Sequence, residues 1–439
     1  MSEISLSMLE EFSGAFRADP ANVIRRNAVV KNGLPAAAET QREEIDNPMV
    51  FSVELETGKI TNQKASGRCW LFAALNTMRF EIMKKLDLET FELSQNYQMF
   101  YDKLEKANFF LDSIVQTASL EVDSRLVKHL LANPMQDGGQ WDMYCALARK
   151  YGVVPKAVMP ETWHSSNTRM MCKFLELKLR EDAMLLRKAV AAGEDTEEMK
   201  RGMLCEIYRI LVICLGEPPK TFTFEYRDKE KNFHRDEDIT PLRFFEKYVG
   251  LDLDEYVSVI NAPTKDKPYG RTFTVEYLGN VVGGRPVKYL NLPSGELKRL
   301  AIAQLQDGRP VWFGCDVGQM LTRESGIMGM HTYDYEALMG VRFGLDKAER
   351  LDYSESMMTH AMVFLGVNLV DGKPNRWKVE NSWGDKSGQD GYYIMTDEWF
   401  DEYNYQIVVD RKYLTEEQKA QFAQEPIALR PWDPMGSLA

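Results

Sequence analysis

The most informative run in this chain of 439 residues is Gln63-Lys64-Ala65-Ser66-Gly67-Arg68-Cys69-Trp70. It places an amide side chain six residues before a cysteine. Beyond this run, apolar residues recur at the three- and four-residue spacing of an amphipathic helix, namely Leu71, Leu75, Met78 and Ile82. Cys69 is therefore predicted to lie in the first turn of a helix.

The position of Cys69 favours a reactive thiol. Unpaired backbone N–H groups and the helix dipole stabilise negative charge in a first turn, and Arg68 adds a positive charge beside it. Both effects lower the pKa of a thiol from its free value of roughly 8.5, and the thiolate is the form that attacks carbon. The alternative is a buried cysteine that only packs.

Two later segments supply partners for this thiol. His360 precedes the apolar run Val363-Phe364-Leu365-Gly366-Val367, and Asn381 lies in Val379-Glu380-Asn381-Ser382-Trp383-Gly384 after a short turn. We expect the two segments to form neighbouring strands, which would place the imidazole beside the amide. His360 would then take the proton of Cys69, and Asn381 would hold the ring in one orientation.

In the order of these motifs the chain resembles the papain-like cysteine peptidases, and within them the bleomycin hydrolase and bacterial aminopeptidase C family. A further segment resembles the glycine pair that lines the unprimed side of the cleft in this fold, Asp137-Gly138-Gly139-Gln140-Trp141. The other matches are Gln63 ahead of Cys69-Trp70, His360-Ala361, and Asn381-Ser382-Trp383-Gly384.

The resemblance implies an α+β, papain-like two-lobed fold: a helical lobe and a β-barrel-like lobe with a large helical insertion. It also implies a thiol aminopeptidase that acts through a thioester, with the catalytic residues Cys69, His360, Asn381 and Gln63. The Gln63 amide and the Cys69 backbone N–H would stabilise the oxyanion. The substrate-binding residues would be Gly138, Gly139, Trp383 and Ala439. The alternatives are a loop glutamine at position 63 and a plain core tryptophan at position 383.

The last nine residues are Pro431-Trp432-Asp433-Pro434-Met435-Gly436-Ser437-Leu438-Ala439. An extended segment of that size can reach on the order of 30 Å. In the resembling family the C-terminus lies in the cleft and blocks its unprimed side, and its carboxylate can pair with the α-ammonium group of a substrate. The carboxylate of Ala439 is therefore expected to select free N-termini, although a frayed end is the ordinary alternative.

Cys69 and His360 are 291 positions apart, about twice the separation of roughly 130–150 residues in simple papain-like enzymes. An insertion is therefore predicted. We expect a helical catalytic lobe in residues 1–165, a mainly helical oligomerisation insert in 166–295, a β-rich catalytic lobe in 296–430 and a C-terminal arm in 431–439. The resemblance implies a homohexameric cage with its active sites facing an internal cavity.

Cysteine usage and charge limit the class of protein. Six thinly spread cysteines without a CxxC pair are typical of a reduced compartment, and Ser66 stands where secreted relatives carry a second cysteine. The sequence begins without a signal-peptide pattern, and no apolar run approaches eighteen residues. A cytoplasmic protein without a membrane partner is expected. The net charge of −12 makes nucleic acid an unlikely partner, although some relatives are associated with it.

Metal and cofactor chemistry have no sequence support. The five histidines are isolated, without an HExxH motif or a Cys/His cluster, and the sequence contains no phosphate loop or dinucleotide fingerprint. We expect no cofactor.

Two kinds of alternative function remain. Within the enzyme class these are a bleomycin-type amide hydrolase and an endopeptidase. Outside the enzyme class, the chain could form a cage whose surface, and not its thiol, carries the function. Such a cage would bind nucleic acid or act as a chaperone. The acidic charge and the complete set of motifs count against this second class.

Overall fold

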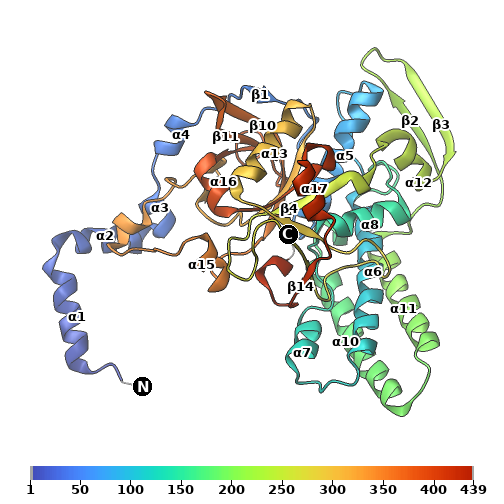
Figure 1. Cartoon of the computed structure of the whole chain (residues 1–439), viewed down its shortest axis with the longest axis horizontal. Coiled ribbons are helices and arrows are strands. Elements are labelled where there is room, and N and C mark those ends of the chain that lie inside the picture. The colour runs from blue at the N-terminus through green and yellow to red at the C-terminus, as the bar shows by residue number, and fades with distance from the viewer. Residues whose placement is uncertain (1–2, 438–439) are drawn as a thin grey trace.

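The computed structural model describes residues 3–437. A helical lobe and a sheet-centred lobe meet along one long helix, α5 (Cys69–Leu86) (Figure 1). Two clusters of buried side chains follow this division. One cluster surrounds α5 and the neighbouring helices, and the other lies on the far side of the sheet.

Helix α5 begins at Cys69, as the sequence predicts. It is not simply amphipathic, because every side chain from Cys69 to Arg79 is buried. A helix that is buried all round must be enclosed by other elements, and α5 packs against helices on one side and against the sheet on the other. The predicted apolar stripe is therefore only one of the faces that it buries.

The helical lobe is built around α5 from four further helices: α6 (Gln95–Gln116), α7 (Arg125–Ala132), α8 (Trp141–Tyr151) and α9 (Trp163–Ser166). Two long helices, α10 (Arg169–Ala192) and α11 (Glu197–Leu215), form a hairpin that packs on α6 and projects from the body (Figure 1). A two-stranded ribbon follows, with β2 (Phe222–Arg227), β3 (Phe233–Ile239), α12 (Pro241–Phe244) and the π-helical turn η1 (Phe245–Val249).

A twelve-stranded mixed sheet forms the second lobe. Its strands, in spatial order, are β14 (Ile427–Leu429), β5 (Thr272–Val275), β6 (Tyr289–Asn291), β4 (Tyr256–Ile260), β13 (Asn404–Asp410), β7 (Val311–Cys315), β10 (His360–Val370), β11 (Lys373–Glu380), β12 (Tyr392–Thr396), β9 (Ile327–Met328) and β8 (Leu321–Thr322), and β1 (Val53–Glu54) pairs with β10. The sheet thus takes up three strands from residues 256–291 as well as those that follow.

Shorter elements complete the chain. Helices α13 (Ser294–Gln306) and α16 (Asp397–Tyr403) pack on the sheet. The remaining helices are α14 (Tyr335–Met339), α15 (Lys347–Asp352), α17 (Glu416–Phe422), η2 (Leu253–Glu255), η3 (Arg411–Tyr413) and η4 (Pro434–Gly436). At the N-terminus, α1 (Leu6–Ala18), α2 (Pro20–Asn32), α3 (Leu34–Ala38) and α4 (Arg42–Asp46) lead away from the body (Figure 1).

The predicted neighbours β10 and β11 are paired antiparallel, with Val363 opposite Glu380. Successive side chains of β10 alternate between the two cores. Ala361 and Val363 join the α5 cluster, whereas Met362 and Phe364 join the opposite cluster. A strand buried on both faces explains the continuous apolar run after His360. Asn381 is the first residue beyond β11.

A buried ion pair joins the two lobes. Nη2 of Arg79 on α5 donates to Oε1 of Glu380 on β11 at 2.6 Å, and both side chains are at most 2% exposed. Asn76 Nδ2 donates to the same oxygen at 2.6 Å. Burial raises the pKa of Glu380, and the neighbouring Arg79 opposes that rise. The pair therefore fixes α5 against the strand that ends beside Asn381.

We expect Glu380→Gln to reduce the free energy of unfolding by about 3–5 kcal/mol, because it leaves the Arg79 charge buried without a counter-charge. The apolar double variant Arg79→Met/Glu380→Leu should lose less than the single variant. Urea unfolding at neutral pH measures both. A single variant within about 1 kcal/mol of wild type would show that the pair does not join the lobes.

Candidate active site

The predicted nucleophile and its partner come from different lobes and lie together. Cys69 opens α5, and His360 opens β10; their residues are 3% and 4% exposed. The backbone N–H groups of Ala361, next to His360, and of Trp70 both act to lower the pKa of the Cys69 thiol. The first turn of α5 therefore lies beside the first residues of β10.

Asn381 fixes the tautomer of His360. The Asn381 Oδ1 atom accepts the backbone N–H of Ser382 at 2.7 Å and lies 2.9 Å from His360 Nε2. Because Oδ1 can only accept, Nε2 carries the proton, and Nδ1 is left to receive another. The Trp383 ring packs against the imidazole, with 4.9 Å between the ring centroids. The sequence-predicted residues His360, Asn381 and Trp383 thus form one contiguous group.

Burial controls the protonation of the thiol and the imidazole. It raises the pKa of Cys69 to about 11, against the opposing hydrogen bonds from backbone N–H groups. It also lowers the pKa of His360 to about 4, although the hydrogen bond to Asn381 opposes this shift. Each group taken alone is therefore neutral at pH 7. A thiolate forms here by passing its proton to the imidazole, so that the two charges arise as a pair.

The expected contribution of Arg68 to the thiol pKa is wrong. Its guanidinium forms two hydrogen bonds with Glu161, at 3.0 and 2.7 Å, and a third with Ser66 Oγ at 2.9 Å. The carboxylate neutralises the arginine, which is almost fully buried. Arg68 therefore fixes the turn before Cys69 and supplies it with no free positive charge.

Gln63 is oriented by its own loop and by Ser382, which follows Asn381. Its Oε1 accepts from Ser382 Oγ at 2.6 Å, and its Nε2 donates to the Ser66 carbonyl at 2.7 Å. The backbone N–H of Gln63 also donates to the Ser382 carbonyl at 2.8 Å. These contacts define which end of the amide is nitrogen, and an amide nitrogen has a second N–H to donate.

The glycine pair is shaped by Trp70 and Lys106. A Cβ atom on Gly139 would lie 2.6 Å from the Trp70 ring, so only glycine fits there. Lys106 Nζ donates to the Gly138 carbonyl at 2.6 Å. In a planar trans peptide, the N–H points away from the C=O. By holding the Gly138 carbonyl, Lys106 therefore directs the Gly139 N–H to the opposite side of the loop.

Asp137 connects this loop to the turn before Cys69. Its Oδ2 accepts the Gly67 N–H at 3.1 Å, and its Oδ1 accepts from Lys103 Nζ at 2.6 Å. Trp70 Nε1 donates to its carbonyl at 2.8 Å. Burial alone would raise the pKa of Asp137, but the adjacent Lys103 brings it well below its usual range. The nucleophile turn and the glycine loop therefore share one charged anchor.

Sequence reasoning missed Lys103 and Lys106. Both lie on α6, and Lys106 also pairs with Asp102 at 2.8 Å. Asp102 and Lys106 are four residues apart, a spacing at which opposite charges pair on the surface of a helix. The sequence therefore contained a signal for the pair, but no signal that the pair is buried beneath the glycine loop.

The C-terminal arm approaches the same loop. Strand β14 pairs with β5, and Asp433 Oδ2 forms a 2.9 Å ion pair with the buried Lys267. Farther on, the Ser437 carbonyl accepts from Gln140 Nε2 at 2.7 Å, one residue beyond Gly139. Ala439, which the sequence predicts to bind substrate, lies outside the described residues.

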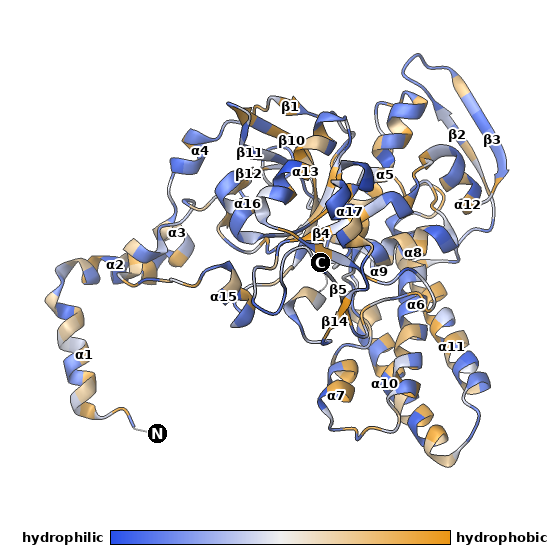
Figure 2. Ribbon diagram, in the orientation of Figure 1, coloured by the Kyte–Doolittle hydropathy of each residue, from blue (hydrophilic) through white to orange (hydrophobic). Residues whose placement is uncertain are grey.

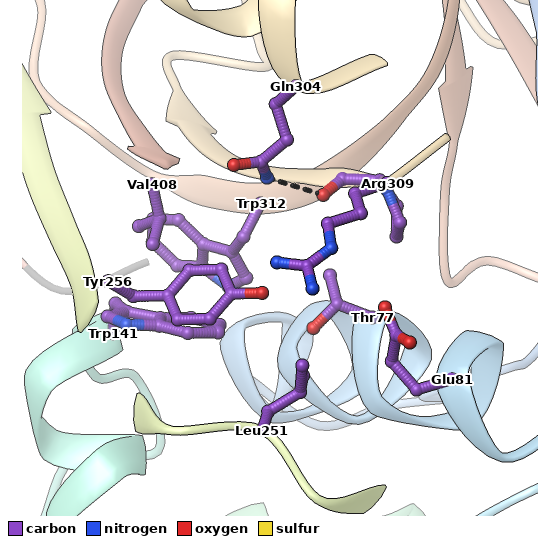
Figure 3. Close-up of a pocket in the computed structure, with 10 residues that line it drawn as sticks. Thr77, Glu81, Trp141, Leu251, Tyr256, Gln304, Arg309, Trp312 and Val408 are labelled. Carbon is purple, nitrogen blue, oxygen red and sulfur yellow. Dashed lines mark hydrogen bonds between the residues drawn. The ribbon is translucent and has the colours of Figure 1, made fainter. Parts of the chain in front are cut away.

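A small pocket lies between α5, α8 and the sheet (Figure 3). Trp141, Tyr256 and Trp312 form one wall, and Arg309 reaches toward Thr77 and Glu81 on α5. Trp312 Nε1 donates to the Trp70 carbonyl at 3.3 Å. The pocket does not include the predicted site residues, and its aromatic wall supports the first turn of α5 from behind.

Between Glu3 and Ser437, no three His, Cys, Asp or Glu side chains are grouped as a metal site requires. Within the same range, no helix is long and apolar enough to cross a membrane.

Comparison with known proteins identifies the family. The sequence model of the Peptidase C1-like family matches residues 3–436. The chain belongs to the Peptidase C1-like family. It is 52% identical to aminopeptidase C of Listeria monocytogenes over 437 residues, which cover 100% of this chain and 99% of the relative. It is also 52% identical to aminopeptidase C of Streptococcus thermophilus, with 100% of both chains covered.

A solved structure agrees with the sequence relatives. The crystal structure of PepW from Lactobacillus rhamnosis is 52% identical, covers 100% of both chains and superposes with a TM-score of 0.99. The predicted family, the papain-like α+β fold and the assignment of the chain as a peptide hydrolase are confirmed.

In a Cys69→Ala variant, His360 should titrate alone, with a pKa below its ordinary value of 6.5, because burial disfavours the imidazolium. The unfolded chain then binds this proton more readily between pH 6.5 and about 4. The contribution to stability is complete above pH 6.5 and is lost as the pH falls through that window. NMR titration of the imidazole tests this expectation, which a pKa at or above 6.5 would contradict.

Proposed function

We propose that this peptidase is a thiol aminopeptidase that removes N-terminal residues from peptides. Cys69 acts as nucleophile, His360 as general base and then general acid, and Asn381 as the group that orients the imidazole. The observation that carries this proposal is the 2.9 Å contact of His360 Nε2 with Asn381 Oδ1 beside a thiol at the start of α5. The names of the relatives favour the same activity.

The reaction follows from the geometry of these groups. A peptide docks between the lobes, and Cys69 Sγ forms a bond to the scissile carbonyl carbon while its proton passes to His360 Nδ1. The Cys69 backbone N–H and the second N–H of Gln63 Nε2 stabilise the oxyanion, and one such donor typically contributes about 3–4 kcal/mol. The imidazolium then protonates the leaving amine as the C–N bond breaks. Water activated by His360 hydrolyses the thioester and restores the thiol.

The C-terminal arm is the proposed selector of free N-termini. It reaches Gln140 beside the glycine pair, which the resemblance places on the unprimed side of the cleft. An arm that fills this side leaves room for one residue before the scissile bond. The carboxylate of Ala439 would pair with the α-ammonium group of that residue. A bleomycin-type amide hydrolase or an endopeptidase would use the same thiol without this restriction.

We also propose that the chain assembles with copies of itself into a hexamer in the cytoplasm. The N-terminal helices support subunit contact, because α1 and α2 bury none of their own residues. Apolar residues recur along α1 (Figure 2), and the side chains of Leu6, Leu9, Phe12 and Phe16 are exposed. Helices α10 and α11 also carry exposed apolar residues, and Figure 2 shows apolar residues along both helices, which fits the proposed oligomerisation role of residues 166–295. The other proposed divisions are the helical catalytic lobe in residues 1–165, the β-rich catalytic lobe in 296–430 and the C-terminal arm in 431–439.

Cys69→Ala should abolish peptide hydrolysis while the protein stays folded, because the thiol is the attacking group. His360→Ala should be nearly as damaging, and Asn381→Ala milder, since Asn381 does not exchange the proton. Steady-state kinetics measure the three losses, and circular dichroism checks the fold. Cys205→Ala, at an exposed position on α11, is the matched control. A folded Cys69→Ala protein with most of its activity would refute the proposed function.

Deleting Ser437-Leu438-Ala439 should weaken cleavage of peptides with free N-termini and admit N-acetylated or internal sites. The truncation removes the proposed carboxylate and reopens the unprimed side. Matched peptide pairs that differ only in N-acetylation measure the change in selectivity. A truncated enzyme that keeps its full preference for free N-termini would show that another group, such as an acidic side chain, is the selector.

A further inference from the structure

Arg323 places a positive charge close to the predicted catalytic group. It begins the loop between β8 and β9, and its guanidinium carbon lies 4.3 Å from the centroid of the Trp383 ring. The Trp383 ring in turn lies 4.9 Å from the imidazole of His360. A single aromatic side chain therefore contacts both the cation and the imidazole.

The backbone around Arg323 is fixed. Its carbonyl accepts the N–H of Gly388 at 2.9 Å, and the Gly326 carbonyl at the end of the loop accepts the N–H of Ile394 at 2.8 Å. These contacts brace the loop against the segment that follows Trp383. Arg323 is exposed, and within residues 3–437 its guanidinium forms no ion pair with a carboxylate. The planar guanidinium fork lies over the Trp383 ring, and its hydrogen-bond donors are unused by the described chain.

The charge of Arg323 also acts on the imidazole. The pKa of His360 is lowered chiefly by burial and further by the positive charge of Arg323. His360 has to carry a proton while the leaving amine departs, so an unbalanced cation nearby opposes the step. A negative group on the guanidinium would remove this opposition. The electrostatics of the site therefore favour an anionic occupant.

Such an anion would belong to the part of the substrate that leaves with the amine, which lies on the leaving side of the cleft. The C-terminal arm and the glycine pair lie at the Trp70–Gln140 end of the site. Trp383 lies instead on the side of Gln63, because it forms a β-bridge with Asn62. The two contacts of Trp383, 4.9 Å to His360 and 4.3 Å to Arg323, set an upper limit of about two to three extended residues, at roughly 3.3–3.6 Å each, on the separation of the guanidinium from the imidazole.

We propose that Arg323 is a carboxylate-binding subsite for the leaving part of the substrate, with Trp383 as its platform. Its ligand is a carboxylate within about three residues beyond the scissile bond. In tripeptides and tetrapeptides this group is the C-terminal α-carboxylate, and in longer peptides it is an Asp or Glu side chain. The subsite rests on the proposed function, and it would make the enzyme prefer short peptides and acidic leaving segments.

The test compares Arg323→Gln with the wild type on matched tripeptides and tetrapeptides that end in a free carboxylate or an amide. The ratio of kcat/KM for the free acid to that for the amide should fall about tenfold, mainly through KM, because the guanidinium binds the group before reaction. Arg323→Lys should fall between the two proteins, since ammonium lacks the planar fork. Amidated peptides with Glu or Gln at the same positions separate the side-chain source from the α-carboxylate.

Arg201→Gln on α11 is the control, because it removes the same charge from an exposed position on the α10–α11 hairpin. It should leave the ratio unchanged. Removing the Arg323 cation should also raise the pKa of His360, which moves the acid limb of the pH profile to higher pH because a protonated imidazole cannot accept the thiol proton.

Two outcomes would overturn the subsite. An equal loss of activity on acids and amides in Arg323→Gln would mean that Arg323 only supports Trp383. A wild type without any preference for free acids over amides would also refute it, and this measurement needs no variant. Both outcomes are compatible with hydrolysis that depends on Cys69, so they leave the proposed function standing.

Discussion

The buried ion pair between Arg79 and Glu380 sets the relation between the two halves of the site. Arg79 is ten positions after Cys69 on α5, and Glu380 immediately precedes Asn381. A helix and a strand are rigid over such distances, so one fixed contact between them places the thiol relative to the amide that orients His360. A buried ion pair is a poor source of net stability because both charges lose their hydration. Its effect here is to fix one register between the lobes.

In this fixed arrangement of the two lobes, the thiol of Cys69 and the imidazole of His360 are both buried. Burial favours the neutral form of each group, and the backbone N–H groups around Cys69 only partly offset its effect on the thiol. Reactivity therefore depends on the two groups exchanging one proton and not on a local positive charge. The contacts around the thiol and the imidazole support this proton exchange. Asn381 fixes the ring tautomer, and Asp137 holds the turn before Cys69.

The sequence predicted the elements whose signals are local. The start of α5 at Cys69 and the pairing of β10 with β11 followed from apolar spacing and turns, and both are confirmed. The partner of Arg68 was not predictable in the same way, because Glu161 is 93 residues distant. The burial of Lys103 and Lys106 was hidden for a similar reason. Their charges are compatible with an exposed helix until the glycine loop folds over them.

The order of the strands in the sheet depends on pairing between distant segments, which the hydrophobic periodicity of the sequence does not reveal. Strand β14 joins β5 from more than 150 positions away, and this contact directs the C-terminal arm toward Gln140. Arg323 carried no motif at all. Its position on Trp383 depends on the backbone contact between its loop and Gly388. In each case the deciding contact joins segments that have no common pattern in the sequence.

The most direct test of the account is the rate at which each of the six cysteines reacts with a limiting dose of iodoacetamide. Cys205 is exposed, whereas Cys69 is buried, so accessibility alone predicts that Cys205 reacts first. The account predicts that Cys69 is alkylated fastest, and that His360→Ala abolishes this advantage because the thiol then has no proton acceptor. Peptide mass spectrometry reads out both results. Alkylation of Cys69 no faster than the other five cysteines would contradict the assignment of Cys69 as a nucleophile.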